Sequence, residues 1–143
     1  MDAKLIAFER LLNIMDDLRA KCPWDKAQTM ESLRHLTIEE VYELTDAILA
    51  GDQDEVKKEL GDILLHIIFY AKIGSETGAF DITSVINQVC DKLIHRHPHI
   101  YSDVNVEDAD EVSRNWEQLK LKEGKKSVLE GVPNSLPSMI KAM

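Results

Sequence analysis

The sequence predicts an all-α protein, a helical bundle of about five helices. Only 6 Gly and 4 Pro interrupt the 143 residues, and between them apolar residues recur every three or four positions rather than every second one. Hydrophobic residues make up 44% of the chain, which is enough for a core without disulfide or metal staples. We therefore expect one helical domain over residues 1–143.

The first predicted helix covers about residues 3–20. Its apolar residues fall on one stripe, as in an amphipathic helix: Leu5, Phe8, Leu11, Leu12, Met15 and Leu18. The following segment, Cys22-Pro23-Trp24-Asp25, is predicted to be a loop that carries Trp24, because proline restricts its neighbour and lacks a backbone donor. A short helical turn is expected around residues 31–35.

Two long helices are predicted in the middle of the chain. Thr37 stands three residues before Glu40, a capping-box spacing that predicts a helix from there to about residue 50, where Gly51 ends it. Asp52 or Asp54 can cap the next helix, over about residues 55–77. Because residues 63–71 are apolar on nearly every side, we expect this to be the central helix, surrounded by others.

The remaining elements are shorter or more polar. Asp81 is predicted to cap a helix over about residues 82–97 that Pro98 ends, and residues 100–106 are expected to be a loop. Residues 107–123 are predicted to form a polar helix stopped by Gly124. We expect residues 125–143 to be a tail that starts another helix at Ser135 or Pro137 and leads to a second domain absent from this chain.

The composition excludes several classes of function. With 17 basic and 26 acidic residues the formal charge is −9, which disfavours a nucleic-acid partner. No window approaches the ~20 apolar residues of a membrane span and the N-terminus lacks a signal core, so we expect a cytoplasmic protein without a membrane contact. Cys22 and Cys90 lie in no zinc-like spacing and are expected to be reduced thiols.

Five acidic residues on the two central helices form the most informative pattern, and they are Glu39, Glu40, Glu43, Glu59 and Asp62. A single acidic motif usually marks a solvated helix face. However, residues three apart on a helix are neighbours, so the last four form two pairs. At ~1.5 Å per residue these pairs lie roughly 10 and 8 Å from the turn, so that an antiparallel hairpin brings them level. The second pair also shares a stripe of the apolar helix with His66.

Four converging carboxylates repel one another and lose hydration unless a positive charge lies among them. An all-oxygen set favours Mg²⁺, with Mn²⁺ possible, over zinc. Such a cation polarises phosphoryl oxygens and lowers the pKa of a bound water, which suits hydrolysis of a phosphoanhydride. Glu39 is the candidate to orient that water or accept its proton, although simple solvent exposure explains this residue equally well.

The pattern E39-E40-x-x-E43 followed by E59-x-x-D62 resembles the signature of the MazG family of all-α nucleoside triphosphate pyrophosphohydrolases. The resemblance extends over about residues 5–135, through CPWDKAQT at 22–29, ELGDILLHIIFYA at 59–71, DKLIHRHPHIY at 91–101 and WEQLKLKE at 116–123. It implies Mg²⁺ held by Glu40, Glu43, Glu59 and Asp62, and hydrolysis of NTP or dNTP to NMP and pyrophosphate. It also implies a homodimer or higher homo-oligomer and a relationship to longer proteins with two such domains.

Four further residues are candidates for substrate binding. Lys92 and Arg96 lie four apart and can clamp a triphosphate, although a solvated helix face is equally compatible. Trp24 and Lys26 can stack on a base and contact phosphate, with core packing as the favoured alternative for the tryptophan. His66 is expected to be hydrogen-bonded in the core rather than to bind a ligand.

A second class of function remains open: a helical dimerisation or interaction module, or a regulatory nucleotide-binding module, with little catalysis. A di-iron oxidase is excluded because that architecture requires two Glu-x-x-His motifs and the sequence contains none.

Overall fold

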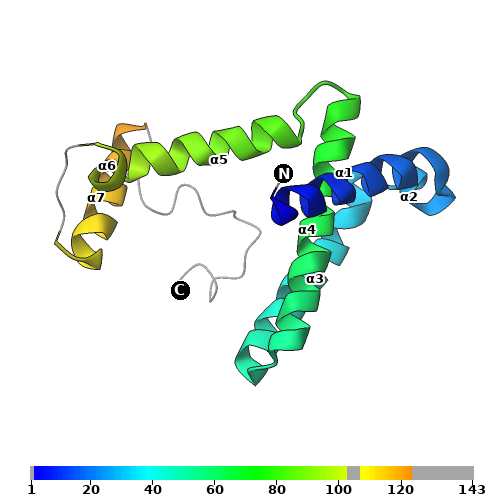
Figure 1. The fold of residues 1–143 in the computed structure, drawn as a ribbon, viewed down its shortest axis with the longest axis horizontal. Coiled ribbons are helices and arrows are strands. Elements are labelled where there is room, and N and C mark those ends of the chain that lie inside the picture. Colours follow the sequence, from blue (N-terminus) through cyan, green and yellow to red (C-terminus); the bar gives the residue numbers. More distant parts are fainter. Residues whose placement is uncertain (1, 103–106, 124–143) are drawn as a thin grey trace. The chain divides into compact units, whose positions relative to one another are not determined.

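The structure, a computed structural model, describes residues 2–102 and 107–123. The all-α prediction is confirmed, since these residues form seven helices and no strand (Figure 1). The chain divides into two compact units, Met1–Ile86 and Asn87–Met143, which are described separately below.

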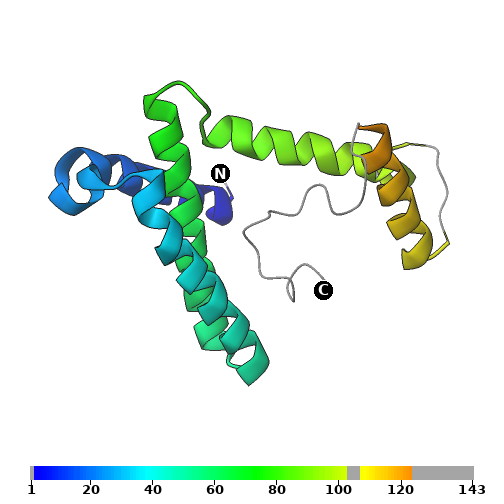
Figure 2. The same cartoon turned by 180° about the vertical axis from the view of Figure 1, so that it is seen from behind.

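The first unit is built around a helical hairpin. Helix α3 (Met30–Ala50) turns back into α4 (Gln53–Glu76), and the two helices pack along one another (Figures 1 and 2). Helix α1 (Ala3–Lys21) packs against α4 and leads into the short α2 (Pro23–Ala27). Helix α4 therefore occupies the central position that the sequence predicted.

The core of this unit lies between α1, α3 and α4. Four buried residues form its centre, Met15, Leu33, Ile68 and Phe69, and each is 1–2% exposed. The expectation that α4 is covered on all sides is not met among the described residues, because Leu60, Leu64 and Ile67 are 52%, 38% and 44% exposed. Helices α1 and α3 cover two faces of α4, and the apolar side chains on a third face of α4 remain exposed.

Two sequence predictions near the start of the hairpin are wrong. Trp24 lies in helix α2 rather than in a loop, because Pro23 occupies the first helical position, where a missing N–H costs nothing. Helix α3 begins at Met30, with a reciprocal capping box in which Ser32 N donates to Thr29 Oγ1 (3.0 Å) and Thr29 N donates to Ser32 Oγ (2.8 Å). Thr37 is not a cap, since it lies within this continuous helix.

The turn between α3 and α4 fixes the register of the hairpin. Gly51 closes α3 with a φ of 67°, a left-handed conformation that glycine adopts without strain. Asp52 then caps α4 by accepting a hydrogen bond from Glu55 N at 3.2 Å, as predicted. The short connection leaves little freedom for one helix to slide along the other.

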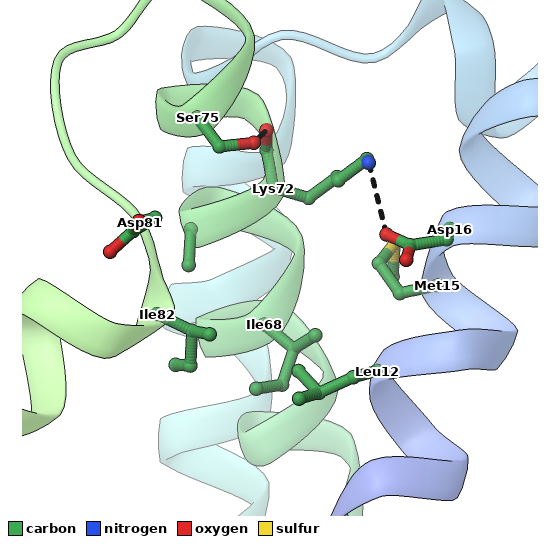
Figure 3. Close-up of a pocket in the computed structure, with 9 residues that line it drawn as sticks. Leu12, Met15, Asp16, Ile68, Lys72, Ser75, Asp81 and Ile82 are labelled. Atoms are coloured by element: carbon green, nitrogen blue, oxygen red, sulfur yellow. Dashed lines mark hydrogen bonds and ion pairs between the residues drawn. The ribbon is translucent and has the colours of Figure 1, made fainter.

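Polar contacts join the outer parts of the first unit. Arg19 Nη1 donates to the carbonyl oxygens of Asp25, Lys26 and Gln28 at 2.7–3.1 Å, while its Nε and Nη2 bind Glu76 at 2.9 Å. A small cavity of about 170 Å³ lies between α1 and α4, with an ion pair of 2.9 Å at its edge, between Lys72 and Asp16 (Figure 3). The apolar part of the cavity wall is formed by Leu12, Met15, Ile68, Ala71 and Ile82, and Ser75 and Asp81 add polar groups beside the ion pair.

Helix α5 (Ile82–Arg96) spans the boundary between the two units. Its predicted cap is confirmed, because Ser84 N donates to Asp81 Oδ1 at 2.8 Å. Part of the predicted loop after Pro98 instead forms the one-turn helix α6 (Pro98–Tyr101), which begins with that proline. Helix α7 (Ala109–Lys122), capped by Asp108, matches the helix predicted over residues 107–123 closely. The expectations for Gly124 and for residues 125–143 lie outside the described residues.

Cys22 and Cys90 are free thiols, as expected. Among residues 2–102 and 107–123, no helix combines the length and apolar character that crossing a bilayer requires.

Candidate metal centre

Three predicted ligands converge between α3 and α4. Glu40 and Glu43 extend from α3 and Glu59 from α4, and one carboxylate oxygen of each lies within 4.8 Å of the others. Glu59 is only 2% exposed, whereas Glu40 is half-buried and Glu43 is exposed. The hairpin therefore brings these acids to the same height and opens the cluster on one side.

The two other predicted acids lie beside this cluster rather than in it. Asp62 is half-buried one turn further along α4, and its charge acts on Glu40 and on His66. Glu39 is exposed on α3 and does not belong to the group of converging oxygens. The structure thus forms a compact set of three carboxylates with a fourth nearby.

The cluster carries unbalanced negative charge. Glu40 Oε2 and Glu59 Oε2 are both buried. When both side chains are ionised, neither oxygen has a hydrogen-bond donor among the described residues. The hydrogen bond to Glu59 is the main cause that raises the pKa of Glu40 to about 7, helped by burial and by the charges of Glu43 and Asp62. The same hydrogen bond lowers the pKa of Glu59. At low pH one proton shared between the two side chains reduces their repulsion.

A hard divalent cation fits this donor set. Three oxygen ligands face one another, two buried oxygens lack donors, and neither His nor Cys belongs to the cluster of described residues. Mg²⁺ and Mn²⁺ prefer such oxygen ligands, whereas structural zinc prefers nitrogen and sulfur. The exposed side at Glu43 leaves room for water and for a ligand that shares the cation.

A cavity of about 430 Å³ adjoins the cluster at the hairpin end and is lined by Glu43, Asp46, Ala47, Ala50, Asp52, Glu55, Lys58 and Glu59. Asp46, Glu55 and Lys58 in this wall were not predicted from the sequence as site residues. Extending the spacing of three or four residues from Glu43 to Asp46 and from Glu59 to Glu55 would have found these two acids. Lys58 Nζ lies 3.2 Å from Glu59 Oε1, a contact that no residue spacing indicates.

A polar network lies one turn away from the cluster, between the same two helices. Thr37 Oγ1 is 2.7 Å from His66 Nδ1 and also contacts the hydroxyl of Tyr70. Burial lowers the pKa of His66, and the charge of Asp62 opposes that shift. The prediction that His66 is hydrogen-bonded within the protein is confirmed, and the network joins α3 to α4 directly beside the acids.

The four predicted substrate-binding residues differ in environment. Trp24 is 55% exposed, so its interpretation as a core residue is wrong, and Lys26 is also exposed. Lys92 is exposed on α5 in the second unit, as a solvated face requires. The Arg96 side chain is only 12% exposed and binds Glu123 at 2.9 Å, which excludes a solvated face for that residue.

The fold and this cluster define an all-α domain with a helical hairpin that carries three converging carboxylates. Residues 28–101 match the family described as the MazG nucleotide pyrophosphohydrolase domain, and the chain belongs to this family.

Known proteins of similar sequence and structure agree with this assignment. The chain is 42% identical over 141 residues to the nucleoside triphosphate pyrophosphohydrolase of Escherichia coli K12, covering 94% of this chain and 54% of that protein. It is 46% identical over 124 residues to the nucleoside triphosphate pyrophosphohydrolase/pyrophosphatase MazG of Thermotoga maritima, covering 85% and 47%. The crystal structure of a mazG-related protein from Thermotoga maritima superposes with a TM-score of 0.69 at 27% identity, covering 79% of this chain and 98% of that chain. The chain thus spans about half the length of these two curated relatives.

Proposed function

We propose that this chain is a Mg²⁺-dependent nucleoside triphosphate pyrophosphohydrolase that converts NTP or dNTP to NMP and pyrophosphate. The observation that carries the proposal is the convergence of Glu40, Glu43 and Glu59, where Oε2 of Glu40 and of Glu59 is buried and has no hydrogen-bond donor in the part of the chain that the structure describes. The names of the relatives in Escherichia coli and Thermotoga maritima support the substrate class.

In this proposal the acids between the two helices hold the cation: Glu40, Glu43, Glu59 and Asp62. A bound divalent cation supplies charge that polarises phosphoryl oxygens and lowers the pKa of a coordinated water. Glu39, exposed beside the cluster on α3, orients the attacking water and accepts its proton. The water oxygen bonds to the phosphorus on one side of the bridge between the α and β phosphates, the bond from that phosphorus to the bridging oxygen breaks, and NMP and pyrophosphate leave.

Four residues outside the cluster are assigned to the nucleotide. Arg96 and Lys92 neutralise the triphosphate, and the planar guanidinium suits phosphate oxygens. Trp24 offers an exposed ring on which a base can stack, with Lys26 two residues further along α2.

We further propose a homodimer or higher homo-oligomer. Exposed apolar side chains recur at helical spacing on the face of α3 away from the acids, and they are Ile38, Val41, Tyr42, Ile48 and Leu49, at 47–81% exposure. Large exposed apolar patches mark contact surfaces. The same stripe favours the second candidate function, a dimerisation or regulatory nucleotide-binding module with little catalysis.

The proposed activity is tested by incubating the chain with NTPs and Mg²⁺ and identifying products by ³¹P NMR. We expect NMP and pyrophosphate, whereas NDP and orthophosphate would refute the predicted cleavage site. Glu40→Gln and Asp62→Asn should each lower turnover at least 100-fold, since each removes a charge that the cation requires. Asp54→Asn, an exposed acid in the first turn of α4, is the matched control and should retain activity.

The two candidate functions are separated by calorimetry with Mg²⁺ and a non-hydrolysable NTP analogue. Binding by a chain that shows no turnover of any NTP would favour the regulatory module.

A further inference from the structure

Lys58 is the one positively charged side chain that the described residues place in the wall of the acidic cavity. Its Nζ lies 3.2 Å from Glu59 Oε1, and the two side chains differ strongly in environment, with 61% exposure for the lysine and 3% for the glutamate. The ammonium therefore reaches from solvent onto the most buried carboxylate of the cluster.

The carboxylate that Lys58 contacts also belongs to the cluster of three converging acids. Glu59 contributes one oxygen to the group that converges with Glu40 and Glu43, and its Oε2 has no hydrogen-bond donor among the described residues. A cation bound among these three acids and the ammonium of Lys58 are thus drawn to the same carboxylate. Two positive charges a few ångströms apart repel one another, and a carboxylate lone pair that accepts a hydrogen bond from Nζ is not free for a metal.

We propose that Lys58 is a built-in counter-ion of the cation-free cluster, and that it competes with the divalent cation for Glu59. In the cation-free protein the ammonium neutralises part of the cluster. When the cation binds, the flexible lysine stem moves the ammonium away toward solvent, which its exposure permits. Lys58 therefore weakens cation binding and helps to set the cation concentration at which the site fills.

This inference rests on the cation site of the proposed function but not on catalysis. It is tested by Mn²⁺ titration of the nucleotide-free protein, with free Mn²⁺ measured by electron paramagnetic resonance. Lys58→Met should bind Mn²⁺ about five-fold more tightly than the wild-type chain, the scale of one partly exposed charge pair. Lys58→Arg keeps the charge and should stay within about two-fold of wild type.

Lys57→Met is the matched control. Lys57 carries the same charge on the same helix, is exposed, and projects about 100° further round, away from the acidic cavity. Its loss removes long-range repulsion of the cation but no contact with Glu59, so its effect should remain below about two-fold.

The outcomes separate the two proposals. Tighter binding by Lys58→Met, with Lys57→Met near wild type, supports the competition. Equal affinities for the two methionine variants overturn it while leaving the cation site intact. Absence of Mn²⁺ binding by the wild-type chain overturns both the cation site and the role of Lys58. Because Lys58 is exposed, circular dichroism of each variant should show an unchanged fold.

Discussion

Glu40→Gln should remove a pH dependence of stability that the cation-free protein owes to its acidic cluster. The pKa of Glu40 is raised from 4.5 to about 7 in the folded chain. Between these two values the folded state retains a proton that the unfolded state releases, so the free energy of unfolding falls as pH rises. Above about pH 7 the full destabilisation is present, and below about pH 4.5 it is absent.

The magnitude follows from the same shift. A rise from 4.5 to about 7 corresponds to about 3 kcal/mol if it is expressed in full. Because Glu40 is only half-buried and the cluster opens to solvent at Glu43, screening reduces this figure. We expect the stability difference between the glutamine variant and wild type to grow by about 1–2 kcal/mol from pH 5 to pH 8.

The assay is urea unfolding in EDTA at several pH values, for wild type and variant in parallel. The lowered pKa of His66 acts in the opposite direction, because it reduces stability as pH falls through the ordinary titration range of histidine. Both proteins contain His66, so its contribution cancels in the stability difference. Glu59, whose pKa is lowered, loses its contribution only below its ordinary value of 4.5. If the free energy of unfolding depended on pH identically in the two proteins, the inference that the raised pKa of Glu40 causes this dependence would be refuted. Saturating Mg²⁺ at pH 8 should stabilise wild type more than the variant.

Two further predictions concern the helical frame. Gly74→Ala places a Cβ 2.6–2.9 Å from ring atoms of Phe80 and should lower the free energy of unfolding, measured with denaturant, by about 1–3 kcal/mol. Adding Phe80→Leu should recover part of the loss. An alanine variant as stable as wild type would contradict this packing. Thr37→Val removes the hydroxyl that joins α3 to α4 and should cost about 1–3 kcal/mol in the same assay. The matched control is Thr45→Val, whose exposed hydroxyl bonds only its own helix, with an expected change within about 0.5 kcal/mol; equal losses in the two variants would show that the network does not stabilise the hairpin.

The sequence predicted the long helices well because each has a continuous apolar stripe and a clear cap. Asp52 and Asp81 both cap the helices assigned to them. The one-turn helices α2 and α6 were not predicted, since four or five residues cannot show a helical period and a leading proline was interpreted as a break. The cap of α3 was predicted at Thr37, whereas Thr29 caps the helix and Thr37 lies inside it, where its hydroxyl contacts His66.

The convergence of the acids could be predicted because the two acid pairs lie at similar distances from the short turn that joins their helices. Spacing along a helix does not determine how deeply each side chain is buried. The sequence therefore did not distinguish Glu59, which is 2% exposed, from Glu43, which lies on the surface. It also did not reveal that Lys58 turns onto Glu59, because a flexible lysine next to an acid has many rotamers and the structure selects one.

The most direct test of the central claim is anomalous diffraction from crystals of the chain grown with Mn²⁺ and a non-hydrolysable NTP analogue. The account predicts an anomalous peak between α3 and α4, with oxygens of Glu40, Glu43 and Glu59 at about 2.1 Å and a phosphate oxygen on the open side. A fully occupied nucleotide with no peak at these carboxylates, or with its cation bound elsewhere, would contradict the account.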